Sequence, residues 1–391
     1  MNRKAQPKIV PANICGEPSW QFKSDKVEAF LSVAAGHLGP VTFQLGGRKV
    51  QPFSVAPWWK EKEAAKLPVI LRVLRGDFFC MPFGGNATPW RSEKHPIHGE
   101  TANANWKLES LTKAGERVCL HASLDTRVRP GRVDKRIFLV KGQAAVYSQH
   151  TISGMSGPMN IGHHAMLRFP DEPESGVIST SPFCFGQVSP TAFEKPAEGG
   201  YSALNVGAQF TSLASVPLAE GGTTDVSRYP ARRGFEDLVL LASDPKLPFA
   251  WTAAVFPKQR HVWFALKDPR VLRQTIFWIS NGGRHYPPWN GRHVGVLGLE
   301  EVTSFFAYGL AESGQPNVLA KRGIPTTLKL DAEKPLVVPY IMAMASVPAG
   351  FDRVRDIVPG DDGKNVCLLA DSGRKATAGL CLDFLKAPAS W

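Results

Sequence analysis

The sequence lacks the features that would place the chain in a membrane, in the secretory pathway or in a zinc-finger class. It contains no run of about eighteen apolar residues, so we expect no membrane-spanning helix. Its N-terminus is basic but has no apolar stretch and no small-residue cleavage site, which argues against a signal peptide. The six cysteines show no C-x-x-C spacing and are typical of reduced core residues. These absences predict a cytoplasmic location.

Concentrated basic charge is also absent, although the chain carries 46 Lys and Arg against 34 Asp and Glu, a net charge of +12. The basic residues are dispersed, and no RNP-like or zinc-finger motif accompanies them, which excludes the common nucleic-acid-binding classes. A G-x-S-x-G nucleophile elbow and a G-x-x-x-x-G-K-[ST] phosphate loop are missing as well. We therefore expect no nucleic-acid partner and no membrane contact.

What the sequence does contain is many short strand-like runs separated by turn residues. The 36 glycines and 32 prolines suit tight turns better than long helices. Runs of β-branched and aromatic residues without regularly alternating helices favour antiparallel sheets. The runs are 41–45, 69–74, 118–122, 136–140, 144–148, 238–242, 251–256, 261–266, 274–279 and 294–299. The predicted fold class is all-β, a large antiparallel β-sandwich with a few short peripheral helices.

A few helices are predicted at the periphery of this sandwich. Ser24 can cap a helix in which Val27, Phe30, Leu31 and Ala34 recur at helical spacing. Residues 60–66 predict a solvated helical turn, and 302–311 a further helical stretch. No repeat or low-complexity linker divides the chain, so we expect one domain over 1–391. Within it, 1–68 would be an N-terminal extension containing the short helix, and the sandwich core would span about 70–345.

Three segments carry the candidate chemistry, and each offers one titratable side chain. His98 lies in a turn-rich polar segment, His164 enters an apolar strand from a Gly/Pro loop, and Glu300 ends an apolar strand together with Glu301. A carboxylate in a buried strand is unfavourable unless it has partners or a task. The alternative is that the acidic pair begins the helical stretch 302–311 and favours its N-terminal dipole. The residues alone leave open which glutamate faces a cleft.

Together these segments resemble the galactose mutarotase-like family, which includes the aldose 1-epimerases. His98 of Pro-Ile-His-Gly-Glu is similar to the family's first histidine, His164 of Gly-His-His-Ala-Met-Leu to the second, and Glu300 of Gly-Leu-Glu-Glu-Val-Thr to its late glutamate. Order and spacing agree, and the resemblance covers about residues 70–345. The resemblance implies the supersandwich form of the fold and no metal or cofactor.

The chain departs from the family pattern at three places. The adjacent Asn-Arg pair of the family is split here into Asn86 and Arg91. Met166 replaces the aromatic residue after the second histidine, and Glu301 stands where proline is usual. Since the superfamily also contains sugar-binding proteins, these departures affect the activity more than the fold.

The resemblance implies an enzyme that interconverts sugar anomers by opening and closing the ring. An acid and a base must then face neighbouring oxygens, and we expect Glu300 to be the base, His164 the acid, and His98 to hold a hydroxyl or shuttle a proton. A non-catalytic carbohydrate-binding protein of the same fold is the alternative. It would keep an aromatic platform but would not need Glu300 and His164 to converge.

Further residues near the motifs are candidates for binding the sugar. Tryptophans can supply an apolar platform, and neighbouring polar side chains can fix hydroxyls. The candidates are Asn86, Arg91, Trp106, Arg168, Trp278, Arg284, His285 and Trp289. Core packing of the tryptophans and a solvated basic rim are the competing interpretations. Together with Arg292, the arginines mildly favour an acidic or phosphorylated sugar as partner; no oligomeric state follows from the sequence.

A metal enzyme is a third alternative. His95 and His98, and the adjacent His163 and His164, are close enough in sequence to supply ligands, with Glu100 nearby. However, the His-Pro-Ile-His-Gly-Glu run does not provide the His-x-His element and spaced glutamate of a cupin. We therefore predict no metal site.

Overall fold

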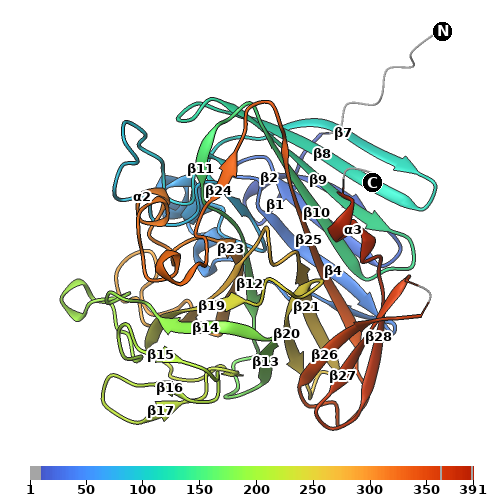
Figure 1. Cartoon of the computed structure of the whole chain (residues 1–391). Coiled ribbons are helices and arrows are strands. Elements are labelled where there is room, and N and C mark those ends of the chain that lie inside the picture. Colours follow the sequence, from blue (N-terminus) through green and yellow to red (C-terminus); the bar gives the residue numbers. More distant parts are fainter. Residues whose placement is uncertain (1–9, 362, 389–390) are drawn as a thin grey trace.

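Two large antiparallel sheets, stacked face to face, form the body of the protein in its computed structural model, which describes residues 10–361, 363–388 and 391 (Figure 1). The first is seven-stranded, in the order β15 (Gln209–Phe210), β14 (Phe183–Val188), β19 (Phe235–Ser243), β22 (Gln274–Asn281), β23 (Val296–Thr303), β12 (Ile161–Arg168) and β6 (Phe79–Cys80). The second is nine-stranded, in the order β18 (Arg228–Tyr229), β13 (Gly176–Thr180), β20 (Ala250–Phe256), β21 (His261–Lys267), β25 (Leu336–Ser346), β10 (Ala145–Ser153), β9 (Gly131–Val140), β8 (Arg117–Thr126) and β7 (Lys107–Ala114). The all-β sandwich prediction is confirmed.

The alternation of side chains along each strand separates the faces of these sheets. On β23, Leu297 and Leu299 belong to the large apolar cluster between the sheets, whereas Val296 and Val302 belong to a cluster on the opposite face. Successive side chains of a strand point to opposite faces, so a buried sheet needs apolar partners on both. The outer face of the seven-stranded sheet is therefore covered by loops and short helices, and it is there that the pocket described below lies.

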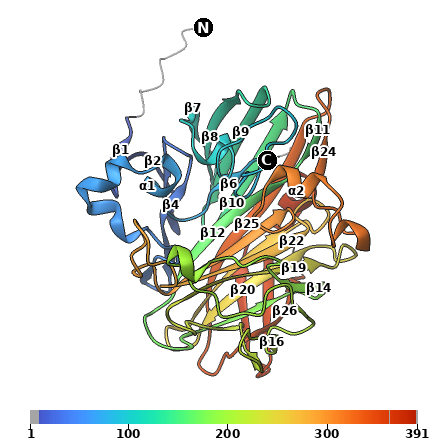
Figure 2. The same ribbon diagram turned by 90° about the vertical axis from the view of Figure 1, so that its left-hand side faces the viewer.

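An N-terminal five-stranded sheet packs into the same core. It contains β1 (Ala12–Ile14), β2 (Glu17–Lys23), β3 (Val27–Ser32), β4 (Leu38–Leu45) and β5 (Arg48–Val50). Apolar side chains of β2, β3 and β4 join the cluster between the large sheets. Figure 2 shows these blue strands beside the large sheets. Residues 10–68 thus contribute to the main core through strands.

The helix predicted from Ser24 was wrong, because this segment forms β3. Val27, Ala29 and Leu31 are all buried, so the strand period of two describes the segment better than the helical period. The Ser24 hydroxyl does accept backbone N–H groups, from Lys26 and Val27, but it stabilises the turn between β2 and β3. An ST turn and a helix N-cap share this local signal.

Two other local predictions were wrong as well. Residues 69–74, expected as a strand, include α1 (Val69–Arg72), whose first turn closes when the Arg72 N–H donates to the Pro68 carbonyl. The helix expected over 302–311 begins later, as α2 (Leu310–Gly314), because β23 continues to Thr303. Both glutamates of β23 therefore lie within a strand instead of at a helix N-terminus.

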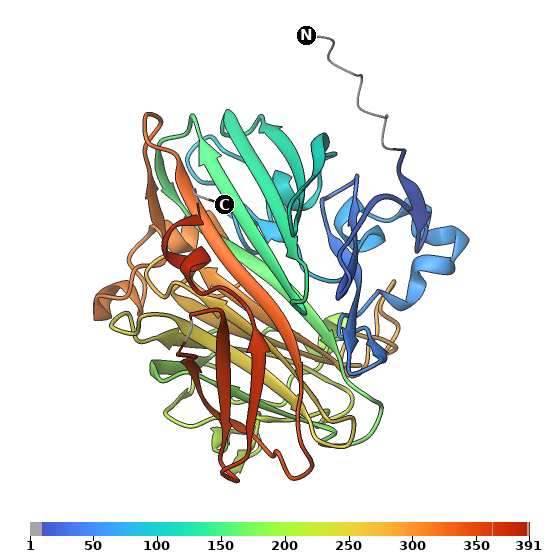
Figure 3. The same ribbon diagram turned by 90° about the vertical axis from the view of Figure 1, so that its right-hand side faces the viewer.

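The C-terminal segment covers the outer face of the nine-stranded sheet. Its sheet contains β26 (Val354–Pro359), β27 (Asn365–Ala370) and β28 (Lys375–Gly379), followed by α3 (Asp383–Lys386). Val366, Leu368 and Phe384 pack there against Tyr147 and Phe264 in one apolar cluster. In Figure 3 these red strands lie in front of the yellow strands of that sheet and beside the orange β25.

The remaining elements are short connections. The two-stranded sheets pair β11 (Gly157–Met159) with β24 (Leu328–Leu330) and β16 (Val216–Pro217) with β17 (Thr223–Thr224). The 3₁₀ turns are η1 (Pro57–Lys60), η2 (Lys62–Lys66), η3 (Glu100–Ala102), η4 (Pro196–Glu198) and η5 (Ala320–Arg322). The helical turn expected at 60–66 is confirmed by η2. Within the described residues, no helix is long and apolar enough to cross a membrane.

Candidate functional site

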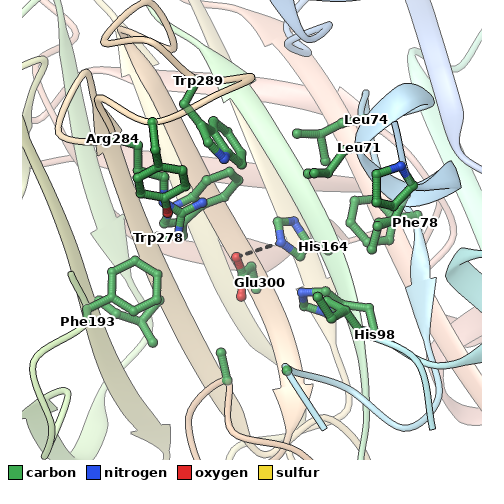
Figure 4. Close-up of a pocket in the computed structure, with 17 residues that line it drawn as sticks. Leu71, Leu74, Phe78, His98, His164, Phe193, Trp278, Arg284, Trp289 and Glu300 are labelled. Carbon is green, nitrogen blue, oxygen red and sulfur yellow. Dashed lines mark ion pairs between the residues drawn. The ribbon is translucent and has the colours of Figure 1, made fainter. Parts of the chain in front are cut away.

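A pocket of about 330 Å³ opens on the outer face of the seven-stranded sheet (Figure 4). The three residues expected to be catalytic, His98, His164 and Glu300, all line it. Strands β12, β22 and β23 form its base, and α1, Trp278 of β22 and the neighbouring loops supply the walls. The sheet thus brings together three segments that are far apart in the sequence.

The centre of the pocket is the pair His164 and Glu300. They are direct partners in the antiparallel register of β12 and β23, and both side chains point out of the sheet on the same face. The Nε2 atom of His164 lies 3.1 Å from Oε1 of Glu300. Gly298, two residues earlier on β23, leaves room for the carboxyl, since a Cβ there would lie 2.8 Å from Oε1.

Burial determines the protonation of this pair. Removal from water disfavours a charge, so it raises the pKa of Glu300 well above its ordinary value, and the nearby Arg284 only partly opposes this. The same burial lowers the pKa of His164 well below its ordinary value. Burial therefore favours the uncharged form of each group, a protonated carboxyl next to a neutral imidazole.

His98 completes the polar group at the base of the pocket. Its ring lies 5.1 Å from that of His164, centroid to centroid. Burial lowers its pKa to about 3, so the ring is neutral. The Gly84 N–H donates to Nδ1 over 3.3 Å, which leaves the ring proton on Nε2. His98 can therefore donate a hydrogen bond to a ligand.

One wall of the pocket is aromatic. Trp278 and Trp289 meet edge to face with ring centroids 5.9 Å apart. The guanidinium of Arg284 lies over both indoles, at 5.4 Å from Trp278 and 4.6 Å from Trp289, and 5.2 Å from the ring of Phe193. The platform expected from the sequence is present for these two tryptophans.

Arg284 is balanced by two carboxylates that the sequence analysis did not select. Its Nε donates to Glu194 over 2.6 Å and lies 4.0 Å from a Glu236 oxygen. Glu236 also accepts from the Trp278 indole N–H (3.0 Å), and burial raises its pKa to about 7. Neither glutamate belongs to a recognisable motif, so no sequence signal identified them.

The opposite wall is aliphatic and was missed for a different reason. Pro68, Ile70, Leu71, Leu74 and Phe78 line it, from α1 and the segment that follows. The apolar run at 69–74 predicts a core strand, so the pattern gives no indication of a pocket wall. The proline directly before the segment was the available signal, because proline favours the first turn of a helix.

Asn86 and Arg91 lie outside the pocket lining. The Asn86 amide group donates to the carbonyls of Pro82, Gly84 and Pro96, and its oxygen accepts from the Leu310 N–H, so it organises the loop around His98. Arg91 is exposed and lies 5.5 Å from the ring of Trp90. Asn86 therefore positions a pocket loop, and Arg91 is part of the solvated surface.

Trp106, Arg168 and His285 also lie away from the lining. Trp106 belongs to the cluster between the sheets, and its indole N–H donates to the Thr101 carbonyl. Arg168 is exposed at the end of β12, and His285 is exposed beside Tyr201. Of the eight expected binding residues, the structure places Trp278, Arg284 and Trp289 in the pocket.

The neighbours of the catalytic candidates point the other way, into the space between the sheets. His163 Nδ1 lies 2.9 Å from Asp77, and Glu301 accepts hydrogen bonds from Thr252 and Thr275 and pairs with Lys267. Glu300 is therefore the pocket carboxyl, which answers the question left open by the sequence.

His163 and His164 are adjacent in sequence, which suggested a metal site. Their side chains point to opposite faces of β12, so they cannot bind one metal ion together. His95 pairs instead with Glu93, with Nε2 and Oε2 2.8 Å apart. In the described part of the chain, no group of three His, Cys, Asp or Glu side chains is arranged to hold a metal ion.

Comparison with solved structures shows which class of fold this is. No family model and no curated protein sequence matches the chain. A galactose mutarotase related enzyme from Lactobacillus acidophilus is similar in structure, with a TM-score of 0.53, 11% identity, and coverage of 84% of this chain and 97% of that one. A galactose mutarotase-like protein from Clostridium acetobutylicum gives a TM-score of 0.54, 11% identity, and coverage of 86% and 98%. The chain has the galactose mutarotase-like fold, which confirms the fold expected from the three motifs.

Proposed function

We propose that the protein is an aldose 1-epimerase-like enzyme that interconverts the anomers of a reducing sugar. The observation that carries the proposal is the His164–Glu300 pair, 3.1 Å apart at the base of a pocket with an aromatic wall. Buried titratable groups with opposed pKa shifts in a cleft are typical of acid–base catalysis. The fold shared with mutarotase-like proteins supports the choice of substrate class.

Ring opening moves two protons. One group takes the proton of the anomeric hydroxyl while the other gives a proton to the ring oxygen, and the bond between C1 and the ring oxygen breaks. After rotation about the C1–C2 bond, both transfers reverse and the ring closes as the other anomer. A neighbouring acid and base suit this exchange, because the reversed transfers return both groups to their starting protonation states.

The pKa directions favour a division of roles opposite to the one expected from the sequence. Burial raises the pKa of Glu300 and lowers the pKa of His164, and these directions favour a protonated carboxyl beside a neutral imidazole. In the opening step Glu300 would then protonate the ring oxygen, and His164 would accept the anomeric proton. His98, with its proton on Nε2, would hold a neighbouring oxygen.

Polarimetry on freshly dissolved pure anomers of common hexoses, pentoses and deoxy sugars tests the proposal. We expect the wild-type protein to accelerate mutarotation of at least one of them, and Glu300→Gln to remove most of that acceleration. Calorimetric titration with the same sugars reports binding separately. Acceleration that is equal in both proteins would contradict the assignment of Glu300.

A non-catalytic carbohydrate-binding protein is the second candidate. The aromatic wall of Trp278 and Trp289 favours it, since stacking on indoles serves binding as well as catalysis. Calorimetric binding without any faster mutarotation would support this candidate. The cytoplasmic location and the single-domain organisation stay predictions from the sequence.

A further inference from the structure

The pocket is apolar on two sides and polar only at its base. Trp278, Trp289 and Phe193 form one wall, and Leu71 and Leu74 face them across the His164–Glu300 pair (Figure 4). Ile97 and Ala307 add further apolar surface near the opening. A ligand between the walls therefore meets hydrocarbon and indole on both sides.

Few polar groups of the lining are left to bind a ligand. Arg284 donates to the Glu194 carboxylate through Nε, and the Tyr286 hydroxyl donates to the same carboxylate, so part of the polar surface of the lining is already bound within the protein. The polar side chains at the base are His98, His164 and Glu300, and the terminal amino groups of Arg284 lie at the aromatic wall. The aliphatic wall has no polar side chain, so a fully hydroxylated hexose would place hydroxyl groups against Leu71 and Leu74, and a buried hydroxyl without a partner is unfavourable.

The lining also offers no unbalanced positive charge to an anion. Arg284 is the one arginine or lysine of the lining in the described part of the chain, and it already has Glu194 at 2.6 Å and Glu236 at 4.0 Å. The other arginines that suggested an acidic ligand lie elsewhere: Arg91 and Arg168 are exposed, and Arg292 pairs with Glu61. A phosphate or carboxylate in this pocket would lose its hydration without gaining a free cation.

We propose that the substrate is a neutral sugar in which apolar groups replace some hydroxyls, such as a deoxy or O-methyl sugar with a free anomeric hydroxyl. This inference rests on the proposed function, because it takes the base of the pocket as the place of the anomeric carbon. The apolar part of the sugar lies against Leu71 and Leu74, and the ring stacks on the tryptophan wall. The substrate class follows from the two walls and from the balanced state of Arg284.

Sugars that differ only at C6 give a matched test. The first series is D-galactose, 6-deoxy-D-galactose and D-galactose 6-phosphate. The second is D-glucose, 6-deoxy-D-glucose and D-glucose 6-phosphate. The mutarotation kcat/KM of the 6-deoxy sugar should exceed that of its parent by about 10-fold, the lower end of the discrimination that one small group in an apolar pocket provides. The 6-phosphate should be the poorest of the three. A parent hexose or a phosphate that is preferred in both series would overturn the inference.

A substitution in the aliphatic wall separates this preference from general effects on folding. Leu71→Asn puts a polar amide into the wall, and we expect it to reduce the ratio of kcat/KM for the 6-deoxy sugar over its parent to near one. Leu111→Asn is the control, since Leu111 is also a half-buried leucine but lies on β7, outside the pocket lining. An unchanged ratio in Leu71→Asn would overturn the role of the wall.

Glu194→Gln tests whether Glu194 neutralises the charge of Arg284, because the variant should gain activity on an anionic sugar. Removing this carboxylate leaves the guanidinium with Glu236 alone, so kcat/KM for the 6-phosphate should rise relative to the 6-deoxy sugar, by about 10-fold if one ion pair is released. No change in that ratio would overturn the argument from charge. If none of the six sugars reacts faster than in buffer while calorimetry detects binding of the 6-deoxy sugars, the proposed function fails and the ligand class stands.

Discussion

The two faces of the β12–β23 strand pair carry the same residue types in different surroundings. On the outer face, His164 and Glu300 contact each other at the base of a pocket. On the inner face, one residue along each strand, His163 pairs with Asp77, and Glu301 has Thr252, Thr275 and Lys267 as partners. The inner groups are held by the protein, whereas the outer pair faces a cavity. Burial alone therefore does not distinguish a functional carboxyl; an adjoining cavity does.

Glu300→Gln should produce the largest effect on activity. The amide keeps the shape of the side chain but can neither give nor take a proton, so we expect the rate of mutarotation to fall about 10²–10⁴-fold. The midpoint of urea unfolding should change little, because the substitution leaves no charged group unpaired. Polarimetry and unfolding monitored by circular dichroism measure the two effects. Equal losses of stability and activity would mean that the outer pair is structural.

Glu301→Gln should show the opposite pattern. The neutral amide leaves the buried Lys267 ammonium without its counter-charge, and breaking a buried ion pair in this way costs about 3–5 kcal/mol. We expect that loss in the free energy of unfolding, measured by urea titration. The mutarotation rate per folded molecule, measured by polarimetry, should stay within a few-fold of wild type. A loss of activity as large as that of Glu300→Gln would remove the contrast between the faces.

Gly298→Ala should reduce activity more modestly. The added methyl group would lie 2.8 Å from Glu300 Oε1 and 3.0 Å from Trp278 Cβ, so the carboxyl must move away from its present position. Misplacing a catalytic group by a fraction of an ångström should lower kcat about 10-fold, and polarimetry with the preferred sugar measures it. A kcat equal to that of wild type would show that the carboxyl position is not critical.

The smallest expected effect concerns pH and Glu236. Burial raises the pKa of its carboxyl to about 7 in the folded protein, from an ordinary value of 4.5. The folded state therefore holds a proton that the unfolded state has released, and stability falls as pH rises between these two values. Glu236→Gln cannot release this proton on unfolding. The slope of the unfolding free energy against pH in that window should therefore change by an amount that corresponds to up to about one proton per molecule. Urea titrations at pH 4.5, 6 and 7.5 measure the difference, and parallel curves for the two proteins would contradict it.

The fold and the central pair could be predicted from the sequence, because both depend on short local patterns. Runs of β-branched and aromatic residues identified the strands, and the His-Gly, Gly-His-His and Leu-Glu-Glu elements identified His98, His164 and Glu300. Strand pairing then brings His164 opposite Glu300. The choice of Glu300 over Glu301 could not be made, since a shift of one residue along a strand exchanges its faces.

The walls and the charge balance of the pocket could not be predicted in the same way. Glu194 and Glu236 reach Arg284 from segments distant in sequence, and nothing local marks the contact. The segment with Leu71 and Leu74 reads as a strand because residues 69–71 and 73 are apolar. A single helical turn is too short to show a helical period in such a run. Trp106 was grouped with the binding tryptophans, but residue type does not reveal which tryptophans face the core.

The most direct measurement is exchange NMR on equilibrium mixtures of sugar anomers, with the wild-type protein and the Glu300→Gln and Glu301→Gln variants compared at equal folded concentration. Galactose, glucose and their 6-deoxy forms are the probes. We predict exchange between the α and β signals with wild type and with Glu301→Gln. With Glu300→Gln, exchange should be no faster than in buffer, although this variant should still broaden the sugar signals by binding the sugars. Exchange as fast with Glu300→Gln as with wild type would contradict the catalytic role of the His164–Glu300 pair.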